Sequence, residues 1–106
     1  MILLRREGFV SALRDGLLWY AAQQEHGPKA AELLAERFAA AVDLTVERIS
    51  RQPDSGVVWQ YRPGYRFALV KKPFDRWLIF YRQPAPDSVD LIDLLRGERD
   101  LSRRVK

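Results

Sequence analysis

The sequence predicts an α+β domain in which an N-terminal helical hairpin packs on a small, mostly antiparallel β-sheet. In the first half, apolar residues recur at helical spacing, whereas the second half consists of short apolar and β-branched runs separated by turns that contain Gly and Pro. Consecutive strands joined by such short turns form an antiparallel meander. At 106 residues the chain is too short for two cores, so residues 1–106 are expected to form one domain.

The first half contains the two predicted helices, preceded by a short apolar run at residues 2–5 that is predicted to be an opening strand. The first helix begins near Phe9 and ends at Gly27, because Gly readily adopts the left-handed conformation after a helix and Pro28 is tolerated in the first turn of the next one. The second helix runs from Pro28 to about Arg51. The apolar face of the first is Phe9, Ala12, Leu13, Gly16, Leu17 and Tyr20, and that of the second is Ala30, Leu34, Phe38, Ala41, Thr45 and Ile49.

The second half is predicted to supply the remaining strands. These are residues 57–59, 65–71, 77–82 and 89–95, which are rich in the β-branched and aromatic residues that suit a pleated surface. The segments at 53–56 and 62–64 have the composition of turns. Because residues 77–82 are apolar on both faces, they are expected to form a central strand.

Composition excludes several classes of protein. The chain has no cysteine and one histidine, His26, so neither a disulfide framework nor a metal site of clustered Cys and His is expected. No cofactor is expected either. No apolar run approaches the roughly 20 residues of a membrane span, and the N-terminus lacks the features of a secretory signal. The expected location is therefore the cytoplasm, without membrane attachment.

The charge is unevenly distributed. The formal net charge is +4, but residues 1–50 carry six Lys or Arg against seven Asp or Glu, whereas residues 51–106 carry twelve against seven. A basic C-terminal half favours an anionic partner, which can be a nucleic acid or an acidic protein segment.

Several short motifs follow one another in a recognisable order. They are the Ile-x3-Pro-x2-Gly pattern from Ile49 to Gly56, Arg66, Phe74, the triplet Phe80-Tyr81-Arg82 and the run Leu94-Leu95-Arg96-Gly97-Glu98-Arg99-Asp100-Leu101. In this order the motifs resemble the RelE/ParE superfamily of toxins from bacterial type II toxin–antitoxin systems, in particular the ParE-like plasmid stabilisation proteins. In that family the last motif often reads Leu-His-Gly-x-Arg-Asp, and here Arg96 stands in place of the histidine.

The resemblance implies two different activities. RelE-like members are metal-independent, ribosome-associated mRNA endoribonucleases, and in that case the catalytic residues would be Lys71, Lys72, Tyr81 and Arg82. Arg remains protonated and is suited to holding phosphate, so Lys or Tyr would have to move the proton. ParE-like members inhibit DNA gyrase and need no catalytic set. The C-terminal Tyr or His typical of the ribonucleases is missing, which favours the gyrase inhibitor.

The candidate target-binding residues are Arg66, Arg82, Arg96 and Arg99. Their alternative role is structural, because cations on the solvated face of a sheet discourage edge-to-edge association. The resemblance also implies a cognate antitoxin that neutralises the toxin in a hetero-oligomer. A third possibility is a degenerate, non-toxic relative that acts only as a binding module.

Overall fold

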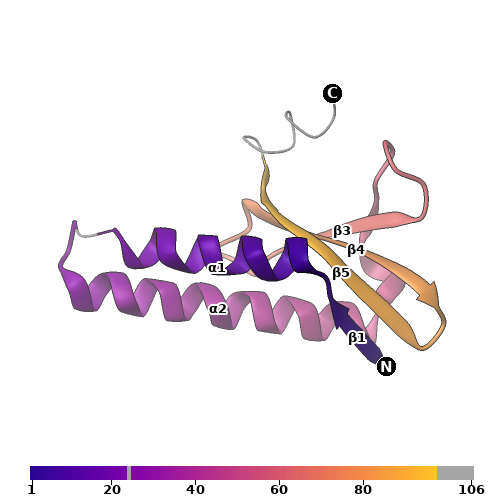
Figure 1. Ribbon diagram of the computed structural model, residues 1–106, viewed down its shortest axis with the longest axis horizontal. Helices are drawn as coiled ribbons and strands as arrows, with labels where there is room; N and C mark the ends of the chain where they lie inside the picture. The colour runs from indigo at the N-terminus through magenta and orange to yellow at the C-terminus, as the bar shows by residue number, and fades with distance from the viewer. Residues whose placement is uncertain (24, 98–106) are drawn as a thin grey trace.

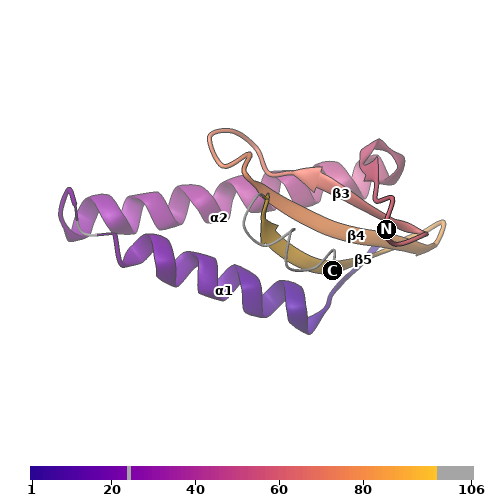
Figure 2. The same ribbon diagram turned by 90° about the horizontal axis from the view of Figure 1, so that it is seen from above.

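The computed structural model describes residues 1–23 and 25–97 and confirms the predicted α+β arrangement. The helical hairpin packs on the sheet and projects beyond it at its far end (Figures 1 and 2). The elements are β1 (Ile2–Arg5), α1 (Glu7–Ala21), α2 (Pro28–Arg51), the 3-10 turn η1 (Pro53–Ser55), β2 (Val57–Val58), β3 (Tyr65–Leu69), β4 (Trp77–Ala85) and β5 (Ser88–Arg96).

The sheet has the strand order β1-β5-β4-β3-β2. Strands β2 to β5 form the predicted antiparallel meander, and β4 lies at the centre as expected. Strand β1 joins the sheet in parallel to β5, with Ile2 opposite Ser88 and Arg5 opposite Leu91. The first strand therefore pairs with the last one, because the helical hairpin carries the chain away from the sheet and returns it at the other edge.

The main core lies between the two helices and the inner face of the sheet. Its fully buried side chains come from both layers: Phe9, Phe38, Val42 and Ile49 from the helices, and Ile79, Tyr81, Val89, Leu91 and Leu94 from the strands. Each large apolar side chain contributes about 1.5–3 kcal/mol when it leaves water. Gly16 is also buried, and an added Cβ would lie against the Phe38 and Trp77 rings, so α1 approaches the rest of the core closely at this point.

Several boundaries differ from the predicted ones. Helix α1 begins at Glu7 and ends at Ala21, well before Gly27. At its end the amide of Gln23 donates to the carbonyl oxygen of Tyr20, three residues back, so the last turn is tighter than an α-helical one. On α2, Ala31 is buried and Ala30 is exposed, so the prediction for Ala30 was wrong. The buried face is offset by one residue at the start of this long helix, where it meets α1.

Candidate functional site

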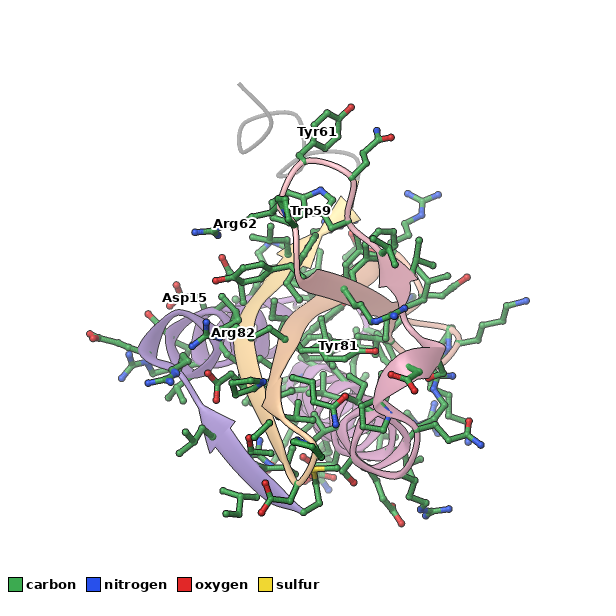
Figure 3. The ribbon with its side chains drawn as sticks, turned by 90° about the vertical axis from the view of Figure 1, so that its right-hand side faces the viewer. Asp15, Trp59, Tyr61, Arg62, Tyr81 and Arg82 are labelled. Carbon is green, nitrogen blue, oxygen red and sulfur yellow. The ribbon has the colours of Figure 1, made fainter. Side chains whose placement is uncertain are left out.

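The three described candidate arginines lie at separate places in the fold. Alternation along the strands puts Arg66 and Arg96 on the inner face of the sheet, which carries the helices, and Arg82 on the outer face. Figure 3 shows Tyr81 and Arg82 pointing to opposite sides of the sheet. Arg99 lies outside the described residues. Arg66, Arg82 and Arg96 are therefore not brought together in one cluster.

Arg66 fastens the turn that follows α2. Its Nη1 donates to the carbonyl oxygen of Gly56 at 2.8 Å and to that of Asp54 at 3.2 Å. Hydrogen bonds from a charged group are stronger than neutral ones. Arg66 thus fixes the 53–56 turn, where the sequence carries the Pro-x2-Gly end of its first motif.

Tyr81, in the central strand of the sheet, binds the same 53–56 turn through its hydroxyl. Its side chain is 0% exposed, and its hydroxyl donates to the carbonyl oxygen of Pro53 at 2.7 Å and accepts from the amide of Gly56 at 3.0 Å. Burial raises the pKa of this hydroxyl above its ordinary value, against the lowering effect of the Gly56 hydrogen bond. The hydroxyl thus uses its donor and an acceptor lone pair in hydrogen bonds to the backbone. This geometry gives Tyr81 a structural role and argues against proton transfer to a substrate.

Lys71 and Lys72 are exposed in the connection between β3 and β4. The backbone amide of Lys71 donates to the Thr45 hydroxyl at 3.0 Å, which ties this connection to α2. In the strand register, Arg82 lies opposite Tyr65, at the start of β3, whereas the lysines follow the end of β3. The strand residues from Tyr65 to Leu69 span about 13 Å, and Lys71 lies two residues beyond the end of β3. The lysines and Arg82 therefore lie too far apart to act on one phosphate.

Arg96 packs against α1. Its guanidinium carbon lies 5.1 Å from the centre of the Trp19 ring, which is a cation–π distance. Trp19 is 44% exposed, so this contact is at the surface, at the end of β5. The position where the resembling family often has histidine is thus occupied here by a cation on an exposed aromatic ring.

Arg82 belongs to an ion-pair network that the sequence did not indicate. Asp90 is 0% exposed, and its Oδ2 accepts from Arg6 Nη2 at 2.9 Å and from Arg82 Nε at 3.1 Å. The hydrogen bond from Arg6, with support from Arg82, lowers the pKa of the Asp90 carboxyl despite its burial. Arg6 directly precedes α1, so three elements meet at this carboxylate. Nothing in the sequence distinguishes Arg6 from Arg5, because the pairing depends on β1 lying beside β5.

A hollow lined by aromatic rings adjoins this network on the outer face. The loop after β2 folds over the sheet, so that the Trp59 ring meets the Phe80 ring at 4.8 Å and Tyr61 lies 6.5 Å from Trp59. Figure 3 shows Trp59, Tyr61 and Arg62 together in this loop. The hollow has a volume of about 340 Å³ and is lined by Trp59, Tyr61, Arg62, Tyr65, Phe80, Ile92, Asp93 and Leu95. We call it the aromatic hollow.

The described residues contain neither a metal site nor a membrane span. In residues 1–23 and 25–97, no group of three or more His, Asp or Glu side chains is arranged to hold a metal ion. The helices of this part of the chain are also too short or too polar to cross a membrane.

Comparison with known proteins gives a match at the level of fold. No protein-family model matches the sequence, and no curated protein does. Among solved structures, the chain is similar to a chain of a structure described as a chromosomal ParDE toxin–antitoxin system from P. aeruginosa. The TM-score is 0.69 at 15% sequence identity, over 92% of this chain and 97% of the other. The chain therefore has a fold found in a ParDE toxin–antitoxin system.

Proposed function

We propose that this protein is the toxin of a toxin–antitoxin pair, that it blocks growth by binding DNA gyrase, and that a cognate antitoxin neutralises it. The observation that carries the proposal is the likeness of fold to a ParDE chain, which extends over 92% of this chain. The order of motifs in the sequence supports the same assignment independently of the fold.

The placement of the candidate catalytic residues favours a protein that acts by binding. Tyr81 is buried and hydrogen-bonded to backbone, and the lysines lie at the far end of β3 from Arg82. Cleavage of RNA requires a base, an acid and a phosphate-binding group around one bond. Among the residues that the structure describes, Lys71, Lys72, Tyr81 and Arg82 do not form such a group.

A basic groove at the β3 edge suits an antitoxin segment. Two adjoining hollows of about 440 and 580 Å³ share Arg48 and Lys71 in their walls. Lys72 and the exposed side chains of Leu44 and Leu69 add further charge and apolar surface. The walls carry four cations, Arg48, Arg51, Lys71 and Lys72, against the two carboxylates of Glu47 and Asp75. This excess of positive charge around apolar side chains fits an acidic segment with apolar anchors. We propose this groove as one contact of the antitoxin.

A supercoiling assay tests the gyrase target. Purified protein, added in increasing amounts to gyrase and relaxed plasmid, is expected to inhibit supercoiling, and addition of the purified antitoxin is expected to restore it. Unimpaired supercoiling at a large excess of the protein would count against gyrase as the target.

Pulse labelling in cells separates this target from the ribonuclease alternative. After induction of the protein alone, thymidine incorporation is expected to fall before methionine incorporation. An earlier fall in methionine incorporation would favour mRNA cleavage, which mapping of message ends on translating ribosomes would then confirm or exclude. Normal growth without any antitoxin would instead indicate a non-toxic binding module.

A further inference from the structure

We infer that the aromatic hollow binds a proline-rich protein segment in the polyproline II conformation, and that an acidic residue of the same segment contacts Arg6 and Arg82. The inference rests neither on the proposed gyrase target nor on the proposed antitoxin groove. Three observations on the outer face of the sheet carry it: an indole N–H without a partner, a hollow whose aromatic wall carries charges of both signs, and two arginines beside that hollow.

The indole N–H of Trp59 is a buried donor without a partner. Its Nε1 atom is shielded from solvent and makes no hydrogen bond to any described residue, although buried donors are normally bonded. Trp59 lines the aromatic hollow, and the ring of Tyr61, 6.5 Å away in the same loop, belongs to a residue that is 56% exposed. The Tyr61 ring can therefore turn aside and admit an acceptor of the ligand to the indole.

The charges in the wall of the aromatic hollow select an uncharged group. Arg62 stacks over the Tyr65 ring at 4.6 Å, and the Asp93 carboxylate also lines the hollow. An anion in the hollow would be repelled by Asp93, and a cation by Arg62. The part of the ligand that enters is therefore neutral, and prolyl rings are neutral groups that dock in aromatic-lined grooves.

The free acceptor that the indole needs identifies the backbone conformation of the ligand. Carbonyl oxygens within a helix or a sheet are already bonded to amides, whereas those of a polyproline II segment have no internal hydrogen bonds. The hollow lies over β4 and β5, which are inner strands, so a strand added at an edge of the sheet does not reach it. A proline-rich segment also holds its conformation before it binds, which lowers the entropic cost of binding.

The arginine pair, Arg6 and Arg82, offers a site for a carboxylate. Both guanidinium groups contact the same oxygen of Asp90, so one negative charge faces two positive ones. Arg82 uses its Nε and Arg6 its Nη2, which leaves other N–H groups of each guanidinium outside these bonds. The side chains of Arg6 and Arg82 are 50% and 41% exposed. Two fixed, half-exposed guanidinium groups with a net positive charge suit an acidic side chain of a ligand.

The aromatic hollow and the arginine pair are contiguous. Arg82 lies opposite Tyr65 across the strands and two residues after Phe80 on the same face of β4, a separation of about 7 Å along the strand. Tyr65 and Phe80 both line the hollow. A polyproline II segment rises about 3.1 Å per residue. The acidic residue is therefore expected roughly two or three residues from the proline that enters the hollow.

Fluorescence anisotropy tests the inference with three labelled peptides of equal length. The first has about eight prolines, a polyproline II helix of roughly 25 Å, with a pair of glutamates at each end. In the second the glutamates are glutamines, and in the third glycine and serine replace the prolines. The first is expected to bind most tightly, and the second more weakly because it offers no carboxylate to the arginine pair. Absence of binding by the first peptide, or equal binding of the first and third, would overturn the inference.

Arg82→Gln tests the acidic contact. It leaves Asp90 bonded to Arg6, and it is expected to weaken binding of the glutamate peptide about two- to fivefold, as for a half-exposed ion pair, without changing the affinity for the glutamine peptide. The matched control is Arg37→Gln, which removes the same charge from an exposed position on α2 and is expected to change neither affinity. Equal losses for the two peptides in Arg82→Gln, or an equal loss in Arg37→Gln, would contradict the proposed contact.

Trp59→Phe tests the indole donor, because it keeps an aromatic ring and removes the N–H. Since this N–H has no partner among the described residues, the Tm is expected to change little, whereas the affinity for both proline peptides is expected to fall about two- to tenfold, the usual value of one hydrogen bond. In NMR spectra of the natural protein, the indole N–H signal that is missing from Trp59→Phe is expected to move when the glutamate peptide is added. An unmoved signal, or an unchanged affinity of a folded Trp59→Phe, would rule out the assigned hydrogen bond.

Tyr65→Ala provides a second test of the hollow if the Trp59 variant fails to fold. It removes one ring from the wall and keeps the backbone hydrogen bond from the Trp59 amide to the Tyr65 carbonyl oxygen. Affinity for the proline peptides is expected to fall more than about fivefold, as for an aromatic anchor of an interface, and an unchanged affinity would contradict binding in the hollow. Gyrase and antitoxin are absent from these assays, so their failure would leave the proposed function untouched.

Discussion

At the scale of single residues, Gly56 in the turn after α2 lies directly against Tyr81 of the sheet, and its amide donates to the Tyr81 hydroxyl at 3.0 Å. A Cβ on Gly56 would overlap the Tyr81 hydroxyl and ring carbons, although the φ of Gly56, −71°, is one that any residue adopts. Gly56→Ala is therefore expected to destabilise the fold through steric overlap, by about 1–3 kcal/mol. Urea unfolding measures this change in the free energy of unfolding. Compared with Tyr81→Phe alone, adding Gly56→Ala should cost less than it does in the natural protein, because the hydroxyl that the new Cβ would overlap is absent. An equal cost in both backgrounds would exclude contact with the hydroxyl as its cause.

Asp90 gives the protein an acid-sensitive contribution to stability. Its pKa is lower in the folded state than the ordinary value of about 3.9, chiefly because Arg6 donates a hydrogen bond to it. A group with a depressed folded pKa stabilises the fold above its unfolded pKa, and the contribution is lost as the pH falls through the folded pKa. Asp90→Asn is thus expected to lower stability at neutral pH and to flatten the decline below about pH 4. A pH series of urea unfolding curves checks it, and parallel curves for the two proteins would contradict the assignment.

At the scale of elements, the tight packing of α1 rests on Gly16. A Cβ there would lie 3.0 Å from Phe38 Cε2 and 3.3 Å from Trp77 Cη2, so the aromatic rings fill the space that a side chain would need. Gly16→Val is expected to destabilise the fold by about 1–3 kcal/mol, whereas Ala40→Val on the exposed side of α2 should change it far less. Thermal unfolding of both variants compares them. Equal shifts in Tm would mean that helix propensity dominates over packing.

The sequence predicted the type of each element better than the contacts between elements. Local pattern sufficed for α2, where buried side chains such as Phe38 recur at helical spacing, and for the central strand, where residues 77–82 are apolar on both faces. It did not predict Arg6 beside Asp90, since this contact depends on strands 84 residues apart. For the same reason, Arg66, Arg82 and Arg96 were grouped as one set, although the sheet places them on different faces. The aromatic hollow also depends on the path of the loop after β2, which composition alone does not determine.

At the scale of the whole molecule, the parallel pairing of β1 with β5 brings the first and last described strands together. Local hairpins close short loops, whereas this pairing closes a loop that includes both helices and most of the sheet. Contacts between distant segments are costly to form early, because the loop-closure entropy must be paid before they stabilise the chain. We therefore expect the β3-β4-β5 meander to be partly formed in the folding transition state and β1 to join later.

Folding kinetics test this order with two variants. Leu3→Ala removes a side chain of β1 that packs against the core, and Ile79→Val trims one in the centre of the meander. Stopped-flow chevrons are expected to show that Leu3→Ala mainly accelerates unfolding, with a φ-value near zero, because its contacts form after the barrier. Ile79→Val is expected to slow folding, so that most of its loss of stability appears in the folding rate and little in the unfolding rate. A φ-value for Leu3 equal to or above that for Ile79 would mean that β1 docks no later than the meander forms, which contradicts this order.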